Sequence, residues 1–283
     1  MPQTYTDNEA AIRRASYDDA EYPQVAYVNG KCINIVADLW HTPETALWKS
    51  GAVTRSNEEA CMMAATATWL LWREKMMAEG RQVSSPNFVI SSQHSPIWDS
   101  FSQLWNIEMR SPSGCSDGCD TERLISLCDD DTICVIHSVR EDHGHSDGGL
   151  ESLDRAIGSL NAHKPYAIPI HIDAGDSGLS LPFTSPEMLW DFRLDNVRSI
   201  SAYCPYESEV FPGTGFVCWR DRGCVPEGML FTVNYLGTEI SQVGLNFSRS
   251  TDGLLNHYAR YVRLGQEGVR QAVVSRASGE AEH

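Results

Sequence analysis

Residues Ile168-Pro169-Ile170-His171-Ile172-Asp173-Ala174 form a short apolar run that ends on an acidic residue. Similar short runs recur along the chain, at residues 88–90, 133–136, 197–200 and 215–219. Runs of this length are typical of strands buried on both faces. Helical segments separate the earlier runs, at residues 97–105, 121–128 and 150–163. Strands that alternate with helices predict an α/β protein whose mostly parallel sheet is sandwiched by helices.

The segment before these runs predicts two more helices and a strand. An amphipathic helix is expected from Val25, because apolar residues recur every three or four positions until Pro43 stops the pattern. A short strand at residues 52–54 then leads into a helix over residues 57–78. Residues 1–20 are polar and acidic without a sustained period, and we expect a flexible arm there.

Composition excludes several classes of partner. The chain has 283 residues and a net charge of −16, so its average field repels the phosphate backbone of nucleic acid. It has neither an apolar run long enough to span a membrane nor a leader-like N-terminus, so no membrane association is expected. The nine cysteines are scattered through apolar stretches, which is typical of reduced core thiols. These features favour a cytoplasmic globular protein.

Five stretches, one of them within the run quoted first, stand in an order and spacing that resembles the glutamate decarboxylase family, the group II pyridoxal-phosphate-dependent decarboxylases. They are Pro169-Ile170-His171-Ile172-Asp173-Ala174, Trp190-Asp191-Phe192-Arg193-Leu194, Phe211-Pro212-Gly213-Thr214-Gly215, Asn234-Tyr235-Leu236-Gly237 and Leu245-Asn246-Phe247-Ser248-Arg249. The resemblance extends from about residue 22 to about residue 265. It implies a fold-type I aminotransferase-like large domain over residues 21–270, a flexible tail over 271–283 and a missing C-terminal small domain.

The resemblance also places a substitution at the position of the family's Schiff-base lysine. Tyr206 stands there, Pro205 replaces the adjacent histidine, and Tyr203 replaces a serine. Only four lysines occur in the chain, and none lies near this position in the sequence: Lys31, Lys49, Lys75 and Lys164.

The family's phosphate-binding turn is altered as well. Ser56-Asn57-Glu58-Glu59-Ala60 replaces a serine-rich turn, and Glu58 brings a negative charge to the start of a helix. Ser56 and Glu59 have the spacing of a capping box, which satisfies helix amides internally. Asp173 corresponds to the acid that faces the pyridine nitrogen of the cofactor; alternatively, it only binds a neighbouring loop. The sequence thus indicates a vestigial cofactor site made of Asn57, Glu58, Asp173 and Tyr206.

These replacements predict a protein that has lost dependence on pyridoxal phosphate and uses no cofactor. We expect acid/base chemistry of the lyase, cyclase, isomerase or decarboxylase type on a small organic molecule. His143 or His145 would be the base, because imidazole titrates near neutral pH, and Tyr203 or Tyr206 would donate the proton. The candidate catalytic residues are His94, His143, His145, Asp173, Tyr203 and Tyr206.

Three alternatives remain open. The histidines at 143 and 145 could belong to a solvated loop without a catalytic role. Together with Asp142 and Asp147 they offer metal donors, but their order matches no metal-site signature, and no metal is expected. A catalytically inactive pseudoenzyme is the alternative function, acting as a binding or regulatory partner of a related decarboxylase. In either case the family implies a homodimer.

Overall fold

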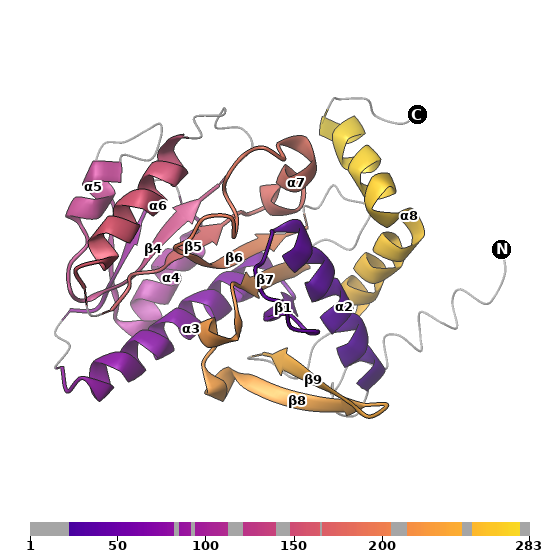
Figure 1. Ribbon diagram of the computed structural model, residues 1–283, viewed down its shortest axis with the longest axis horizontal. Coiled ribbons are helices and arrows are strands. Elements are labelled where there is room, and N and C mark those ends of the chain that lie inside the picture. The colour runs from indigo at the N-terminus through magenta and orange to yellow at the C-terminus, as the bar shows by residue number, and fades with distance from the viewer. Residues whose placement is uncertain are drawn as a thin grey trace.

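The computed structural model describes residues 23–81, 85–91, 94–112, 121–139, 148–164, 166–204, 214–244 and 251–277. A seven-stranded sheet with the order β1-β7-β6-β5-β4-β2-β3 forms its centre (Figure 1). The strands are β1 Gly51–Thr54, β2 Asn87–Ile90, β3 Glu108–Arg110, β4 Thr132–Ser138, β5 Ile170–Asp173, β6 Val197–Tyr203 and β7 Gly215–Trp219. Strands β3, β2, β4, β5 and β6 are parallel, and β7 is antiparallel to both β6 and β1.

Helices cover both faces of the sheet. They are α2 Pro23–Leu39, α3 Asn57–Ala78, α4 Pro96–Trp105, α5 Thr121–Ser126, α6 Gly148–Asn161, α7 Leu181–Thr184 and α8 Asp252–Ala277. Side chains of α3 and α4 form apolar clusters on one face, whereas α2, α5, α6, α7 and α8 contribute to a larger cluster on the other (Figure 1). The expected α/β fold with a mostly parallel sheet is confirmed.

Strand β5 shows how the two faces differ. Ile170 and Ile172 enter the large apolar cluster, while His171 and Asp173 alternate with them and face α3 and α4. All four residues are buried. Strand β5 therefore carries its polar side chains on one buried face, where they need hydrogen-bond partners.

Several elements were not expected from the sequence. Strand β3 has only three residues and lies at the sheet edge. A separate hairpin is formed by β8 Leu230–Tyr235 and β9 Thr238–Val243 and packs against α2. Helix α8 continues past residue 270 to Ala277, with a non-helical residue at Gly265. The expected arm over residues 1–20 lies outside the described residues.

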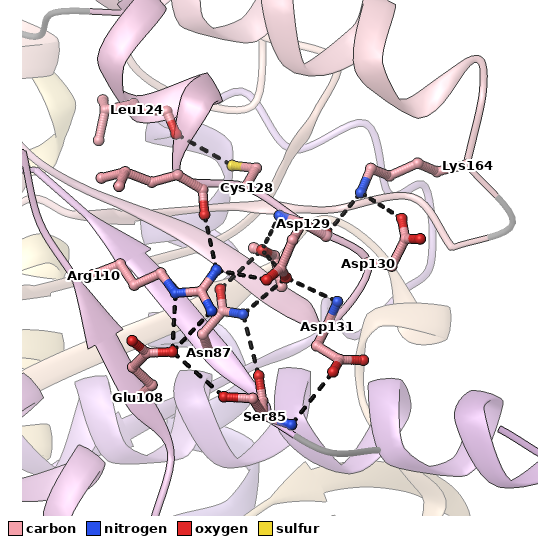
Figure 2. A network of polar contacts seen from close by, with 12 residues as sticks. Ser85, Asn87, Glu108, Arg110, Leu124, Cys128, Asp129, Asp130, Asp131 and Lys164 are labelled. Carbon is pink, nitrogen blue, oxygen red and sulfur yellow. Dashed lines mark hydrogen bonds and ion pairs between the residues drawn. The ribbon is translucent and has the colours of Figure 1, made fainter. Parts of the chain in front are cut away.

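A polar network lies at the amino end of the strands β2 and β4 (Figure 2). The Arg110 guanidinium bonds Glu108 through Nε at 3.0 Å and Asp129 through Nη1 at 2.6 Å. Asn87 Nδ2 donates to Asp129 Oδ1 at 2.9 Å, and Lys164 Nζ donates to the Asp129 carbonyl at 2.6 Å. The network ties the edge strand β3 to the turn that precedes β4.

No helix of the described residues has both the length and the apolar character needed to cross a membrane. All seven cysteines in these residues are free thiols, and five of them are buried. This agrees with the expectation of reduced core thiols.

Candidate active site

The candidate site lies at the carboxyl ends of the parallel strands. The network of Figure 2 lies at the opposite end of the sheet. Asp173 is the last residue of β5, and its neighbours across the sheet are Ser138 at the end of β4 and Ser201 on β6. In open α/β sheets ligands bind beyond the carboxyl ends of the strands. Asp173 is only 4% exposed, so a charged carboxylate here requires hydrogen-bond donors.

Four groups supply those donors. Trp98 Nε1 on α4 donates to Asp173 Oδ2 at 2.9 Å, and the Gly175 amide donates to Oδ1 at 3.3 Å. The side chains of Asn57 and Cys61, one turn apart on α3, also bond the carboxyl group. Burial raises the pKa of Asp173, and these four hydrogen bonds oppose that rise. The expected role of Asp173 as a loop ligand is present too, since Gly175 belongs to the following loop.

The start of α3 is capped by the chain itself. Ser56 Oγ accepts a 3.2 Å bond from the Glu59 amide, as expected for a capping box. The reciprocal bond differs, because Glu59 Oε2 accepts from the Arg55 amide at 2.7 Å rather than from Ser56. Glu58 is exposed in the same first turn. A phosphate at this helix end would therefore meet one exposed negative charge at Glu58.

Strand β7 approaches the start of α3 closely at Gly215. A Cβ atom at this residue would lie 2.4 Å from the Ser56 carbonyl oxygen and 2.4 Å from Thr54 Oγ1. Only glycine allows this approach, which fixes the first turn of α3 beside the end of β6. The close packing thus places Asn57 within reach of Asp173.

Tyr203 lies beside the loop that follows Asp173. It ends β6, and its amide donates to the Gly175 carbonyl at 2.8 Å. Gly175 has a positive φ of 49°, a conformation that favours glycine. The structure therefore brings together Asp173, Asn57 and Tyr203 among the residues expected at the site.

His94 lies at the entrance to α4, one turn before Trp98. Its Nε2 is 3.2 Å from Asp99 Oδ1, and its buried Nδ1 has no hydrogen-bond partner in the described residues. Within the described ranges, Asn57 Oδ1 and Ser138 Oγ are likewise buried without a hydrogen-bond partner. Buried polar atoms normally have partners, so these atoms are candidates to bind a ligand.

The remaining sequence-predicted residues lie outside the described residues. These are His143, His145 and Tyr206, together with Asp142 and Asp147 of the metal alternative. Within the described ranges, no three His, Cys, Asp or Glu side chains are grouped so that they could hold a metal ion.

Each of the four lysines is engaged by other groups. Lys49 Nζ is 2.6 Å from Asp38, and Lys164 Nζ is 3.0 Å from Asp130. Lys75 Nζ lies 3.9 Å from Glu79, while Lys31 lies over the rings of Tyr27 and Trp48. All four lysines therefore have partners other than the groups that surround Asp173.

The family described as "Pyridoxal-dependent decarboxylase conserved domain" matches residues 9–279. The chain belongs to the pyridoxal-dependent decarboxylase family. Glutamate decarboxylase beta of Listeria innocua is 34% identical over 95% of this chain, and glutamate decarboxylase of Lactococcus lactis subsp. cremoris is also 34% identical over 95%.

Solved structures extend the comparison to the fold. Glutamate decarboxylase of Lactobacillus brevis superposes with a TM-score of 0.83 and 32% identity, covering 97% of this chain and 63% of that one. A sphingosine-1-phosphate lyase of Burkholderia pseudomallei matches with a TM-score of 0.69 at 20% identity, which shows the fold alone. The chain spans about 60% of the length of the curated relatives it matches.

Family membership corrects the function expected from the sequence. The prediction of an enzyme that has lost dependence on pyridoxal phosphate is wrong, and so is its alternative of an inactive partner. The prediction gave too much weight to a few replaced residues, above all Tyr206. Asp173, the acid that the resemblance places opposite the pyridine nitrogen, is buried at the end of β5 and accepts hydrogen bonds from Trp98 and Gly175.

Two residues of the site were missed from the sequence. Neither Trp98 nor Cys61 was among the candidate residues. Cys61 follows Asn57 by four residues on a helix, so the two share one face. That spacing was the available signal for Cys61, whereas the bond from Trp98 requires the packing of α4 against the sheet.

Proposed function

We propose that this chain supplies the cofactor-binding domain of a pyridoxal-dependent decarboxylase that acts on an acidic α-amino acid. The observation that carries the proposal is the buried Asp173 carboxylate at the end of β5, bonded by Trp98 at 2.9 Å. The substrate class rests on the relatives, which are named glutamate decarboxylases. The activity is proposed for the whole protein, because the chain covers only part of those relatives.

The residues at the strand ends fit the pyridine part of the cofactor. When bound, pyridoxal phosphate supplies an electron sink for bond cleavage at the α-carbon of an amino acid. An ionised Asp173 holds a proton on the pyridine nitrogen, because the two opposite charges stabilise each other in a buried site. Asn57 Oδ1 and Ser138 Oγ, which have no hydrogen-bond partner among the described residues, can bind polar groups at the same end of the sheet. We place Tyr203 and His94 at the rim of this site, where each can orient a substrate group.

The phosphate end depends on the start of α3. Its first-turn amides and helix dipole attract an anion, while the exposed Glu58 weakens that attraction. The lysine side chains are bound elsewhere, as described above. We therefore propose that the cofactor is held by noncovalent contacts and is removed by dialysis.

The test is a titration with pyridoxal phosphate followed by visible absorbance. The wild-type protein is expected to bind saturably, and Asp173→Asn is expected to bind at least about tenfold more weakly, since an ion pair in a buried site is lost. Asp195→Asn is the control, because Asp195 is an exposed acid whose side chain is 94% accessible. Failure of the wild type to bind, or equal affinity of Asp173→Asn and Asp195→Asn, would overturn the proposal.

Two further measurements examine the mode of binding and the activity. Borohydride treatment of the loaded protein, followed by intact mass, is expected to leave the protein mass unchanged. A stable mass increase would place the cofactor on an amino group of the protein and contradict noncovalent retention. Release of CO2 from L-glutamate by the loaded protein, and its loss in Asp173→Asn, would support the proposed reaction. The absence of release from acidic amino acids would reject the proposed substrate class.

We also propose that the chain assembles as a homodimer, as its family resemblance implies. Sedimentation velocity at micromolar concentration tests this assembly. A purely monomeric species would contradict it.

A further inference from the structure

His171 lies two residues before Asp173 on β5 and on the same face of the sheet. Side chains of the neighbouring strand β6 hold both of its ring nitrogens. His171 Nδ1 is 2.8 Å from Ser199 Oγ, and Nε2 is 3.1 Å from Ser201 Oγ. The register explains these contacts, since His171 is opposite Ser199 and Asp173 is opposite Ser201. Strand β6 therefore holds the imidazole at two points of its ring.

These two bonds fix the plane of the imidazole. His171 is 2% exposed, and burial lowers its pKa to about 3, so the ring is neutral. A neutral imidazole has one donor and one acceptor nitrogen, and a serine hydroxyl can bond either of them. Two other histidines differ, because His137 Nδ1 and His257 Nε2 are buried without a hydrogen-bond partner among the described residues. The ring of His171 therefore cannot rotate about its Cβ–Cγ bond without losing both serines.

The fixed imidazole contacts the indole of Trp98 on α4. The two ring centroids are 5.2 Å apart with an interplanar angle of 60°, which is an edge-to-face contact. Trp98 is 1% exposed, and its Nε1 donates to Asp173 Oδ2 at 2.9 Å. An indole has a single donor, which lies in the plane of the ring. The rotation of the Trp98 ring therefore decides whether its N–H points at the carboxylate.

Burial alone does not give an indole a hydrogen-bond partner in this protein. The Nε1 atoms of Trp72, Trp190 and Trp219 are buried and have no partner within the described ranges. These three side chains are as inaccessible as Trp98, with exposed fractions of 1%, 0% and 1%. Trp98 differs from them in its contact with a ring that hydrogen bonds hold at two points. A bonded N–H therefore needs a neighbour that fixes the rotation of the indole.

We propose that His171 is a positioning residue that aims the Trp98 N–H at Asp173. Ser199 and Ser201 fix the imidazole for this purpose. His171 acts through Trp98 and touches neither the cofactor nor the substrate. The consequence for cofactor binding rests on the proposed function, whereas the control of the Trp98 hydrogen bond does not.

The first test follows the Trp98 N–H in the protein without cofactor. The chain has eight tryptophans, and the nuclear magnetic resonance signal of the Trp98 indole proton is assigned by its loss in Trp98→Phe. Ser199→Ala and Ser201→Ala each remove one hydroxyl partner of His171 and add no aromatic ring that would itself shift the signal. Each is expected to move the Trp98 signal upfield, because the hydrogen bond to Asp173 weakens when the imidazole is less constrained.

Ile172→Val is the matched control for this measurement. Ile172 is fully buried on the same strand but belongs to the apolar cluster on the other face of the sheet. Its substitution removes one buried methylene, so it shows whether destabilisation alone moves the Trp98 signal. Circular dichroism verifies that each variant is folded. An unmoved signal in both serine variants, or an equal shift in Ile172→Val, would overturn the proposal.

A double-mutant cycle tests whether His171 acts through Trp98 on the binding of pyridoxal phosphate. His171→Leu alone is expected to weaken binding about twofold to tenfold, the range that the loss of an aromatic pair implies. In the Trp98→Phe background the same substitution is expected to change the affinity by less than about twofold, because the donor is already absent. An equal loss in the two backgrounds would mean that His171 acts by another route, and it would contradict the proposal.

The proposed function and the role of His171 fail in different ways. If the wild type does not bind pyridoxal phosphate but the Trp98 signal moves in the serine variants, the role of His171 stands and the cofactor assignment fails. If the wild type binds pyridoxal phosphate and the Trp98 signal does not move, the cofactor assignment stands and the role of His171 fails.

Discussion

Trp98 donates from Nε1 to Asp173 Oδ2 at 2.9 Å, and its ring also meets His171 edge to face at 5.2 Å. One side chain of α4 therefore covers both the last residue of β5 and the imidazole two residues before it. The bond and the ring contact can be separated, because phenylalanine keeps an aromatic ring but has no donor.

Trp98→Phe is expected to weaken binding of pyridoxal phosphate by about tenfold or more. A hydrogen bond to a buried charged group contributes about 1.5–3 kcal/mol, and its loss leaves Asp173 harder to ionise. The measurement is the absorbance titration at pH 7.5. Trp105→Phe on the same helix is the control, since Trp105 is 42% exposed and lies at the far end of α4. Equal affinities for the two variants would show that the Trp98 bond does not support the cofactor.

Glu58→Ser is expected to tighten binding of pyridoxal phosphate by about twofold to fivefold. The substitution removes a negative charge from the first turn of α3, and charges near a helix end act on a bound anion by about 0.3–1 kcal/mol. The gain should shrink with added salt, which screens exposed charges. Glu74→Ser is the control, since Glu74 lies on the same helix about 24 Å along its axis. No gain over Glu74→Ser would mean that the phosphate does not bind at this helix end.

His257→Phe is expected to make stability less dependent on pH. Burial, followed by the charge of Arg260, lowers the pKa of His257 to about 4, so the folded protein binds its proton far more weakly than the unfolded chain does. In the wild type, the contribution of neutral His257 to the free energy of unfolding is therefore complete above pH 6.5 and is lost as the pH falls toward 4. The substituted phenylalanine keeps a ring in contact with Phe216 but does not titrate. The wild type's loss of about 1.4 kcal/mol in the free energy of unfolding per pH unit in this range should therefore disappear.

Urea unfolding at pH 7, 6 and 5 measures that slope. His163→Gln is the matched control, because His163 is exposed after the end of α6. At pH 7 the His257→Phe protein should be at least as stable as the wild type, since the buried Nε2 has no partner in the described residues. A slope equal to that of His163→Gln would contradict the prediction.

Arg110→Met is expected to lower the free energy of unfolding by about 1–2 kcal/mol at pH 7. Burial alone would raise the pKa of Asp129, but hydrogen bonds from Arg110 and Asn87 outweigh it and lower that pKa below 3.8. The contribution of ionised Asp129 to the free energy of unfolding is thus complete above pH 3.8 and is lost at lower pH. Thermal unfolding between pH 7 and pH 3 follows this loss. Arg155→Met, which removes one exposed local bond, should cost less than about 0.5 kcal/mol.

Much of the fold was predictable because its signals are local. Buried strands such as β5 and β7 are short apolar runs, and α3 is marked by its cap at Ser56. Strand β3 was missed because Glu108 and Arg110 are polar and the strand lies at an edge. The turn of the β8–β9 hairpin contains Leu236 with φ of 48°, a residue that rarely adopts this conformation and gives no turn signal.

The site was predictable only in part. Asp173 could be placed because it ends a strand, and strand ends meet at one edge of a parallel sheet. The donors Trp98 and Cys61 come from two helices, and their bonds to Asp173 depend on how those helices pack. Tyr206 led to the wrong function, since one replaced residue says little about the contacts that hold the rest of a ligand. His143 and His145 remain predictions.

The order of strands in the sheet has a consequence for synthesis on the ribosome. Gly51 of β1 pairs with Cys218 of β7, and Asn29 of α2 bonds Gln242 of β9, 213 residues later in the chain. Helix α2 and strand β1 therefore leave the exit tunnel long before their partners exist. Their apolar sides, including Ile33 and Val53, stay incompletely covered until β7 and β9 have been synthesised. A nascent chain of this topology is expected to need a chaperone until β7 has left the ribosome, and truncation before β7 should yield an aggregating fragment.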